Sequence, residues 1–234
     1  MNKTRRALVD IVAEAVPIAD RKSLSEDAAD KLRELILLEK LSPGTPVPER
    51  DLAEGLGISR TPMKEALRTL EAEGLIEYGP TRRPRVADPS LHEITQNIQV
   101  LGALEALAGE MACESASDAE VIGVADLNAA MHALPLNVAP LEFFHLDMAF
   151  HARIVGAAQN VPLAKTHAQY NARLWRARFM SSRQIERRAN TLAEHDEILA
   201  ALRDRDAARI ALAMRQHLNS TSVNVARIRD EKES

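Results

Sequence analysis

Residues 49–67 restrict the possible folds of this 234-residue chain more than any other segment. Residues 49–58 have the apolar spacing of a short helix and end in a turn that contains Gly55 and Gly57. Residues 59–67 begin with the hydroxyl of Ser59, a residue type preferred at the start of a helix. Two helices joined by a glycine-containing turn form a helix-turn-helix, so the sequence predicts this motif.

The flanking segments predict a small domain around this motif. Ser23 and Glu26 have the spacing of a capping box, which predicts a helix that reaches about Lys40. Residues 75–86, which follow the second helix of the motif, have the pattern of a small β-hairpin. We therefore predict a winged helix-turn-helix domain over residues 23–86, with the hairpin as its wing.

The rest of the chain predicts a second, all-helical domain over residues 91–230, after a linker at residues 87–90 that contains Asp88-Pro89. Apolar residues recur there at helical spacing, and only 3% of the chain is aromatic, which favours closely packed helices. The expected helices cover about 91–115, 118–133, 140–158, 161–181, 184–203 and 206–229. Helices of this length pack as a bundle, so the predicted fold class is mainly α.

Residues 1–22 form an N-terminal extension in which residues 4–16 have the spacing of an additional helix of open function. Cys113 is the only cysteine, and no apolar run approaches the roughly 20 residues that cross a bilayer. These features favour a reducing cytoplasm and predict no membrane partner.

The net charge of −4 gives no overall attraction to nucleic acid, so a DNA-binding role depends on where the cations lie. The cations are concentrated in the predicted winged helix-turn-helix domain at residues 23–86, which we call the reader domain. They are Arg50, Arg60, Lys64, Arg68, Arg82, Arg83 and Arg85. Arg60 and Lys64 are four residues apart on one helix face with Thr61 beside them, so they can enter a major groove together. A solvated cationic helix face is the alternative interpretation, which the turn and the basic wing make less favourable.

Residues 25–86 closely resemble the GntR family of bacterial repressors, through Pro43-Gly44 and the motifs at residues 49–53, 56–62, 65–67 and 70–76. The resemblance implies DNA contacts from Arg50, Ser59, Arg60, Thr61 and Lys64, to which we add Arg82 and Arg83 on the wing. The family usually has Arg at the position of Lys64 and Gly at that of Pro84. Lysine cannot make the forked contact of arginine with guanine, so Lys64 is expected to hold phosphate.

Four side chains in the second domain are candidate metal ligands. Asp147 and His151 are four residues apart, which places a carboxylate and an imidazole on one helix face. His195 and His217 fall on the apolar sides of the last two expected helices. Three imidazoles and one carboxylate facing a bundle interior suit a borderline divalent cation. Taken singly, each histidine fits a hydrogen-bonded core residue better than a ligand.

The C-terminal half resembles the FCD effector domain of the FadR-type branch, through residues 144–154, 194–202 and 207–217. In that family the metal ligands fall at the positions of Asp147, His151, His195 and His217. The resemblance therefore implies a bound divalent metal ion, with Zn²⁺ favoured and Ni²⁺ or Fe²⁺ as alternatives. His132, His145 and His167 do not match the pattern, and we interpret them as surface or core histidines.

One position departs from the family. Relatives often carry an arginine three residues before the Leu104-Glu105 pair, where it can bind an effector carboxylate, but this chain has Leu101 there. Carboxylate capture must then come from the metal itself, from another cation such as Arg173, or not take place at all. The departure favours an effector that is larger or less acidic than a simple hydroxy acid. The alternative for Arg173 is a charge on the bundle surface.

The resulting hypothesis is a transcriptional regulator rather than an enzyme. We expect a homodimer that binds a short inverted repeat of double-stranded DNA and acts as a repressor released by a small organic acid bound beside the metal. A regulator for which the cation itself is the signal, an enzyme that uses an open metal position, and a purely structural cation are the alternatives.

Overall fold

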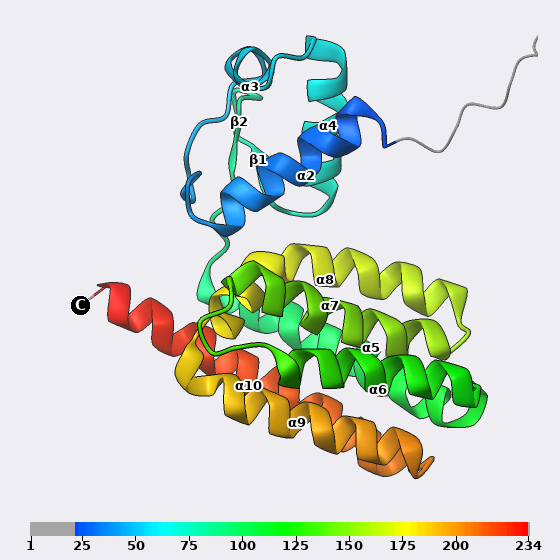
Figure 1. Ribbon diagram of the computed structural model, residues 1–234. Coiled ribbons are helices and arrows are strands. Elements are labelled where there is room, and N and C mark those ends of the chain that lie inside the picture. Colours follow the sequence, from blue (N-terminus) through cyan, green and yellow to red (C-terminus); the bar gives the residue numbers. More distant parts are fainter. Residues whose placement is uncertain (1–21, 234) are drawn as a thin grey trace, which may run out of the picture.

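The computed structural model describes residues 22–233, which form two domains stacked one above the other (Figure 1). The helix expected at residues 4–16 lies outside the described residues. Within the described chain the fold is mainly helical, with one two-stranded sheet in the first domain. The predicted fold class is thus confirmed.

The first domain contains three helices and a hairpin within the described chain. Its elements are α2 (Leu24–Leu37), α3 (Glu49–Leu56), α4 (Arg60–Ala72), β1 (Ile76–Tyr78) and β2 (Pro84–Val86). The capping box of Ser23 and Glu26 begins α2, and Gly57 ends α3 with a left-handed φ of 66° that glycine adopts without strain. The strands are antiparallel, with Ile76 opposite Val86. These elements make the predicted helix-turn-helix and wing.

The core of this domain lies between α2 and α4. Leu32 and Ile36 of α2 are buried against Met63, Leu67 and Leu70 of α4. Because these apolar side chains share one face of α4, the opposite face of that helix, with Arg60 and Thr61 at its start, remains in solvent.

The second domain is a helical bundle. Its helices are α5 (Leu91–Ser115), α6 (Asp118–Ala133), α7 (Pro140–Ala157), α8 (Val161–Ser182), α9 (Ile185–Arg203) and α10 (Ala207–Glu233). Capping boxes begin α5 at Ser90 and α6 at Ser117, and the side chain of Asn160 caps α8. The bounds match the expected ones to within one residue, except that α10 continues to Glu233. Among the described helices, none combines the length and apolarity that crossing a membrane requires.

Helix α5 contacts α7, α8, α9 and α10, so its side chains reach most of the bundle interior. Gly109 permits a close approach to α10, because a Cβ atom there would lie 3.0 Å from Cγ1 of Ile210. The buried face of α5 is apolar except at Glu105, which is fully buried. A buried carboxylate requires charged or hydrogen-bonding partners, and these lie at the candidate site.

The two domains touch through α2, α7 and α8. Leu37 of α2 packs in an apolar cluster with Phe144 and Met148 of α7 and Phe179 of α8. Beside this cluster, Arg176 of α8 and Arg183, which caps the end of α8, donate to the carboxylate of Glu39, two residues beyond the end of α2. The reader domain therefore rests on the same helices that carry the candidate metal ligands and part of the adjoining cavity.

Candidate metal centre and nucleic-acid interface

The exposed face of the first domain carries the candidate DNA contacts. All seven predicted residues are exposed: Arg50, Ser59, Arg60, Thr61, Lys64, Arg82 and Arg83. Ser59 precedes α4 in the N-cap position, and its side chain makes no capping hydrogen bond. The first amides of α4 and this hydroxyl are therefore available to an anion such as a phosphate.

Acidic residues orient two of the arginines of this domain. Nε of Arg60 donates to Glu49 at 3.1 Å, while the Arg60 side chain remains 72% exposed. Nε of Arg85 donates at 2.6 Å to Glu77, its cross-strand neighbour, so its charge is neutralised within the wing. Within residues 22–233, no acid pairs with Arg82 or Arg83, and these two remain the cations of the wing tip.

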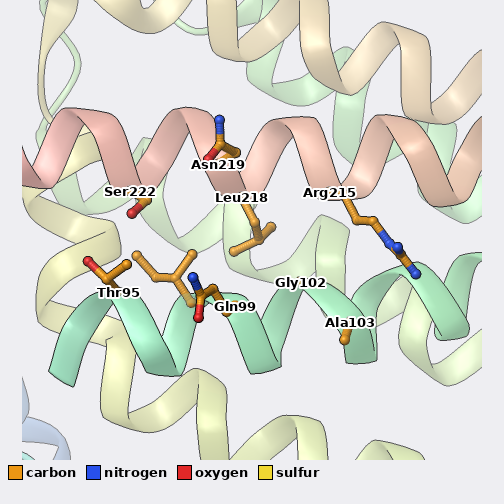
Figure 2. A pocket seen from close by; sticks show the side chains of 9 residues that line it. Thr95, Gln99, Gly102, Ala103, Arg215, Leu218, Asn219 and Ser222 are labelled. Carbon is orange, nitrogen blue, oxygen red and sulfur yellow. The ribbon is translucent and has the colours of Figure 1, made fainter. Parts of the chain in front are cut away.

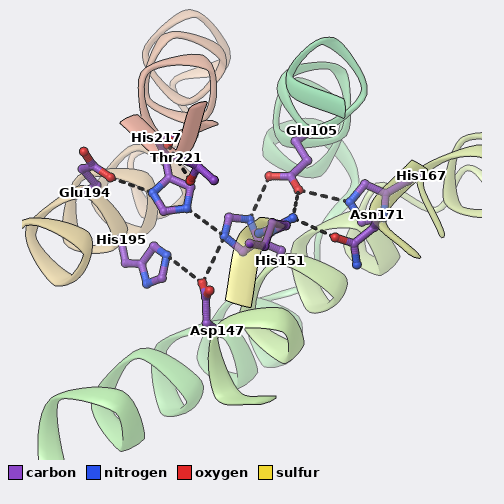
Figure 3. A network of polar contacts seen from close by, with 10 residues as sticks. Glu105, Asp147, His151, His167, Asn171, Glu194, His195, His217 and Thr221 are labelled. Carbon is purple, nitrogen blue, oxygen red and sulfur yellow. Dashed lines mark hydrogen bonds and ion pairs between the residues drawn. The ribbon is translucent and has the colours of Figure 1, made fainter. Parts of the chain in front are cut away.

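The four candidate metal ligands converge inside the bundle. Asp147 and His151 come from adjacent turns of α7, His195 from α9 and His217 from α10. One ligand atom from each side chain lies within 4.8 Å of the others, and all four residues are buried (Figure 3). Three helices thus bring together residues up to 70 positions apart, as the spacing and the resemblance led us to expect.

Two outer carboxylates set the protonation of the histidine rings. Nδ1 of His217 lies 2.7 Å from Oε2 of Glu194, and Nδ1 of His151 lies 2.8 Å from Oε2 of Glu105 (Figure 3). The second contact is short but not aligned as a hydrogen bond. A carboxylate only accepts, so Nδ1 of His217 is the donor to Glu194, and the negative charge of Glu105 favours a proton on Nδ1 of His151. With its proton on Nδ1, each of these two rings can present a lone pair at Nε2.

These lone pairs point at one another. Nε2 of His151 lies 3.2 Å from Nε2 of His217 and 3.4 Å from Oδ1 of Asp147, and Nε2 of His195 lies 3.3 Å from the same oxygen. Such a cluster of acceptors needs a cation among them. A proton can serve: burial lowers the pKa of His151, but the charge of Glu105 and the contacts with Asp147 and Glu105 together raise it above its ordinary value. A divalent ion would satisfy more of the acceptors at once.

Unpartnered atoms also fit a metal ion. Within residues 22–233, Oδ1 of Asp147 and both ring nitrogens of His195 are buried without a hydrogen-bond partner. Burial lowers the pKa of His195 to about 4, so its ring is neutral at physiological pH, as ligation requires. Burial would raise the pKa of Asp147, but the close imidazoles of His151 and His195 hold it well below its usual range. The donor set of three nitrogens and one oxygen suits Zn²⁺, Ni²⁺ or Fe²⁺.

A polar cavity adjoins the centre. Asp147, Glu194 and His217 form one wall, and the arginines of the lining are Arg178 and Arg187. Hydroxyl and amide groups complete the lining, from Ser181, Ser182, Asn190, Thr191, Ser220, Thr221 and Asn224. The two cations and many hydroxyls beside the candidate metal ligands match the chemistry of a small oxygen-rich anion, although the open space is close to that of one water molecule, so a carboxylate would have to displace lining side chains.

The structure places Arg173 outside this cavity. This residue is exposed on α8, against Gly74 of the first domain and over the ring of Tyr170, and it does not line the cavity. Arg178 lies five residues further along α8, about 140° around the helix, and faces the cavity instead. The alternative of a surface charge describes Arg173 better.

Sequence reasoning missed Glu105, Glu194 and Arg178 as functional residues. A single acid in the otherwise apolar stretch 100–109 was the available signal for Glu105. The remaining histidines are placed as interpreted, since His132 and His145 are exposed and His167 is buried.

Comparison with known families agrees with this architecture. Residues 24–86 match the family described as bacterial regulatory proteins, gntR family, and residues 96–220 match the FCD domain. The chain belongs to the GntR family of regulators. Its two matched segments correspond to the reader domain and the helical bundle, and the family consists of DNA-binding transcriptional regulators rather than enzymes.

Individual relatives of this GntR-family protein support the same assignment. It is 33% identical to a Streptomyces ambofaciens protein named HTH-type transcriptional regulator in unstable DNA locus, over 85% of this chain and 84% of that protein. It is 28% identical to the transcriptional repressor RspR of Escherichia coli strain K12, over 82% and 84% of the two chains. The solved structure of E. coli McbR/YncC shares its fold, with a TM-score of 0.73 at 19% identity, over 88% and 99% of the two chains.

Proposed function

We propose that this GntR-family regulator is a repressor that leaves its operator when a small carboxylate binds beside a divalent metal ion in the helical domain. The convergence of Nε2 of His151 and His217 at 3.2 Å supports the metal site, because two buried lone pairs require a cation between them. Relatives that are named repressors favour this direction of control.

Asp147, His151, His195 and His217 would hold the metal, for which Zn²⁺ is our first choice and Ni²⁺ or Fe²⁺ the alternatives. When bound, the ion would supply a Lewis-acid position for an oxygen of the effector. Arg178 and Arg187 would hold the anionic charge, and the hydroxyl groups of the cavity would select an effector that carries hydroxyls of its own.

The reader would use its cationic residues in two ways. Arg60, Thr61 and Ser59 lie at the start of α4 and would reach base edges and the adjoining phosphates. Arg50, Lys64, Arg82 and Arg83 would hold the backbone. Arg173 has no role in effector binding in this proposal.

A measurement of operator binding separates these roles. The operator is first selected from random-sequence DNA by the wild-type protein. We expect Arg60→Ala to weaken operator binding by about 1–3 kcal/mol and to relax sequence preference. Arg82→Ala should instead weaken binding to all DNA sequences by the same amount. Normal, selective binding by Arg60→Ala would show that α4 does not read the operator through this residue.

We further propose a homodimer on a short inverted repeat, in which a second copy packs on the outer face of α5 and α10. A groove runs between these helices, lined by Gln99, Gly102 and Leu218 among others (Figure 2). Exposed Val100 and Leu212 lie on the same two helices, and apolar side chains left in water favour association. Sedimentation of Leu212→Glu tests this assignment, since an unchanged dimer would place the interface elsewhere.

A metal-responsive regulator is the second candidate, because the centre joins α7, α9 and α10 and could by itself set their packing. Operator affinity measured across a zinc titration, with and without small carboxylates, separates the two. A carboxylate effect at constant zinc supports the first proposal, and a response to zinc alone supports the second.

A further inference from the structure

Glu105 contacts three side chains that can carry positive charge, and it is fully buried. Oε1 accepts from Nη1 of Arg178 at 2.9 Å and lies 3.2 Å from Nε2 of His167. Oε2 lies 2.8 Å from Nδ1 of His151 (Figure 3). Burial would raise the pKa of Glu105, but His151 and Arg178 hold it well below its usual range, so the carboxylate is charged.

The two oxygens of Glu105 face two different sites. Oε2 faces a candidate metal ligand, and Oε1 faces Arg178, which lines the polar cavity. Nη1 of Arg178 also donates to Oδ1 of Asn171 at 2.8 Å, away from the cavity. A single carboxylate on α5 therefore connects a cavity arginine on α8 with a ligand on α7.

We infer that Glu105 is a positioning residue that couples the metal centre to the anion-binding cavity through Arg178. This inference rests on the metal site and the anionic effector proposed above. An anion that engages Arg178 draws that cation's charge away from Oε1. The negative charge of Glu105 then acts more strongly on the Nδ1 side of the His151 ring, 2.8 Å away, which makes Nε2 a better metal ligand.

The coupling is reciprocal by thermodynamic necessity. If occupation of Arg178 strengthens metal binding by a given factor, the metal strengthens anion binding by the same factor. The effector and the ion would then bind cooperatively, so each would bind more weakly in the absence of the other.

Glu194 provides a matched control. It stands in the same relation to His217, with Oε2 at 2.7 Å from Nδ1, but its other oxygen accepts from the hydroxyl of Ser220 rather than from an arginine. Loss of either carboxylate should weaken zinc binding about 10–100-fold, because each orients a ligand. Only loss of Glu105 should make zinc affinity independent of the charge of Arg178.

The test is a double-mutant cycle that needs no identified effector. Replacement of Arg178 by glutamine removes the same cation that an anion would engage. Zinc affinity is measured by competition with a chromophoric chelator in full-length wild type, Arg178→Gln, Glu105→Gln and the double variant. The Arg178→Gln substitution is also made in a Glu194→Gln protein.

We expect Arg178→Gln to tighten zinc binding at least fivefold in the wild type and in Glu194→Gln, and less than twofold in Glu105→Gln. Equal tightening in all three would show direct repulsion between Arg178 and the ion, and would overturn the role of Glu105. No tightening in the wild type would overturn the coupling itself.

Two further variants keep the test decisive if Glu105→Gln does not fold. Glu105→Asp keeps the charge, but its side chain is too short to reach both His151 and Arg178. In this variant, too, Arg178→Gln should no longer tighten zinc binding. Arg178→Lys keeps the cation and should leave zinc affinity within twofold of the wild type. A wild-type protein that does not bind zinc at all would instead refute the proposed metal site, which is a different outcome from zinc binding without coupling.

Discussion

Glu39 holds the reader domain against the bundle. Its carboxylate accepts from Arg176 at 3.4 Å and from both terminal nitrogens of Arg183 at 3.3 Å. The side chains of Glu39, Arg176 and Arg183 are 26%, 14% and 28% exposed, so the contacts are partly shielded from water. The distances are long for charge-assisted bonds, so we assign each arginine about 0.5–1 kcal/mol, and the pair about 1–2 kcal/mol.

The perturbation is Glu39→Gln, which keeps the size of the side chain and removes its charge. Loss of about 1–2 kcal/mol of docking energy raises the population of separated domains about 5–30-fold. Glu34→Gln is the control, because within residues 22–233 the ion pair of Glu34 is with Lys31 on the same helix, at 3.5 Å and largely in solvent. We expect Glu34→Gln to change the population of separated domains by less than twofold.

Thiol labelling measures the separated population. Leu37 is buried in the cluster between the domains, and Leu37→Cys places a reactive thiol there. When separation is fast compared with labelling, the rate is proportional to the separated fraction. Cys113 is buried and is the only natural thiol, so the parent protein gives its contribution to the signal. Equal rates with and without Glu39→Gln would refute the reasoning, and would assign docking to the apolar cluster alone.

Three further outcomes are expected. In metal-free protein, burial lowers the pKa of His195 from 6.5 to about 4, so the unfolded chain binds the extra proton between these pH values. Stability should therefore fall by about 3 kcal/mol as pH drops through this window, and urea titrations of His195→Gln should lack that part of the slope. Gly109→Ala should destabilise by about 1 kcal/mol in the same titrations, because its Cβ meets Ile210, which is fully buried, whereas Gly156→Ala has open space and should stabilise by about 0.5 kcal/mol. Zinc at 1,000 times its Kd should stabilise the wild type by about 4 kcal/mol in thermal melts, and an unchanged Tm would contradict the metal site.

Most of the fold could be predicted from the sequence because its signals are local. The capping box of Ser23 and Glu26, residues three positions apart, predicted the start of α2, and the structure shows the same motif at Ser90 and Ser117. The prediction was less accurate for the end of α2, because the helix was expected to reach about Lys40 but ends at Leu37. Glu39 adopts a left-handed φ of 57° there, and no glycine marks that position in the sequence.

The candidate site was predicted only in part, for a similar reason. The ligands recur at helical spacing on apolar faces, and the structure places all four together. The orientation of Arg173 and Arg178 depends on how α8 rotates against its neighbours, and both are arginines on one helix. The roles of Glu105 and Glu194 depend on contacts between helices far apart in the chain, which spacing does not reveal.

Charge balance around the centre supports an anionic effector. Asp147, Glu105 and Glu194 have pKa values lowered by the contacts named above, and contribute three negative charges at neutral pH. Arg178 and Arg187 contribute two positive charges at the cavity. With neutral imidazoles, a divalent ion leaves one positive charge in excess in a region that is largely shielded from water. A monoanionic carboxylate would neutralise that charge, whereas a neutral sugar or a dication would not, and this balance favours the proposed class of effector.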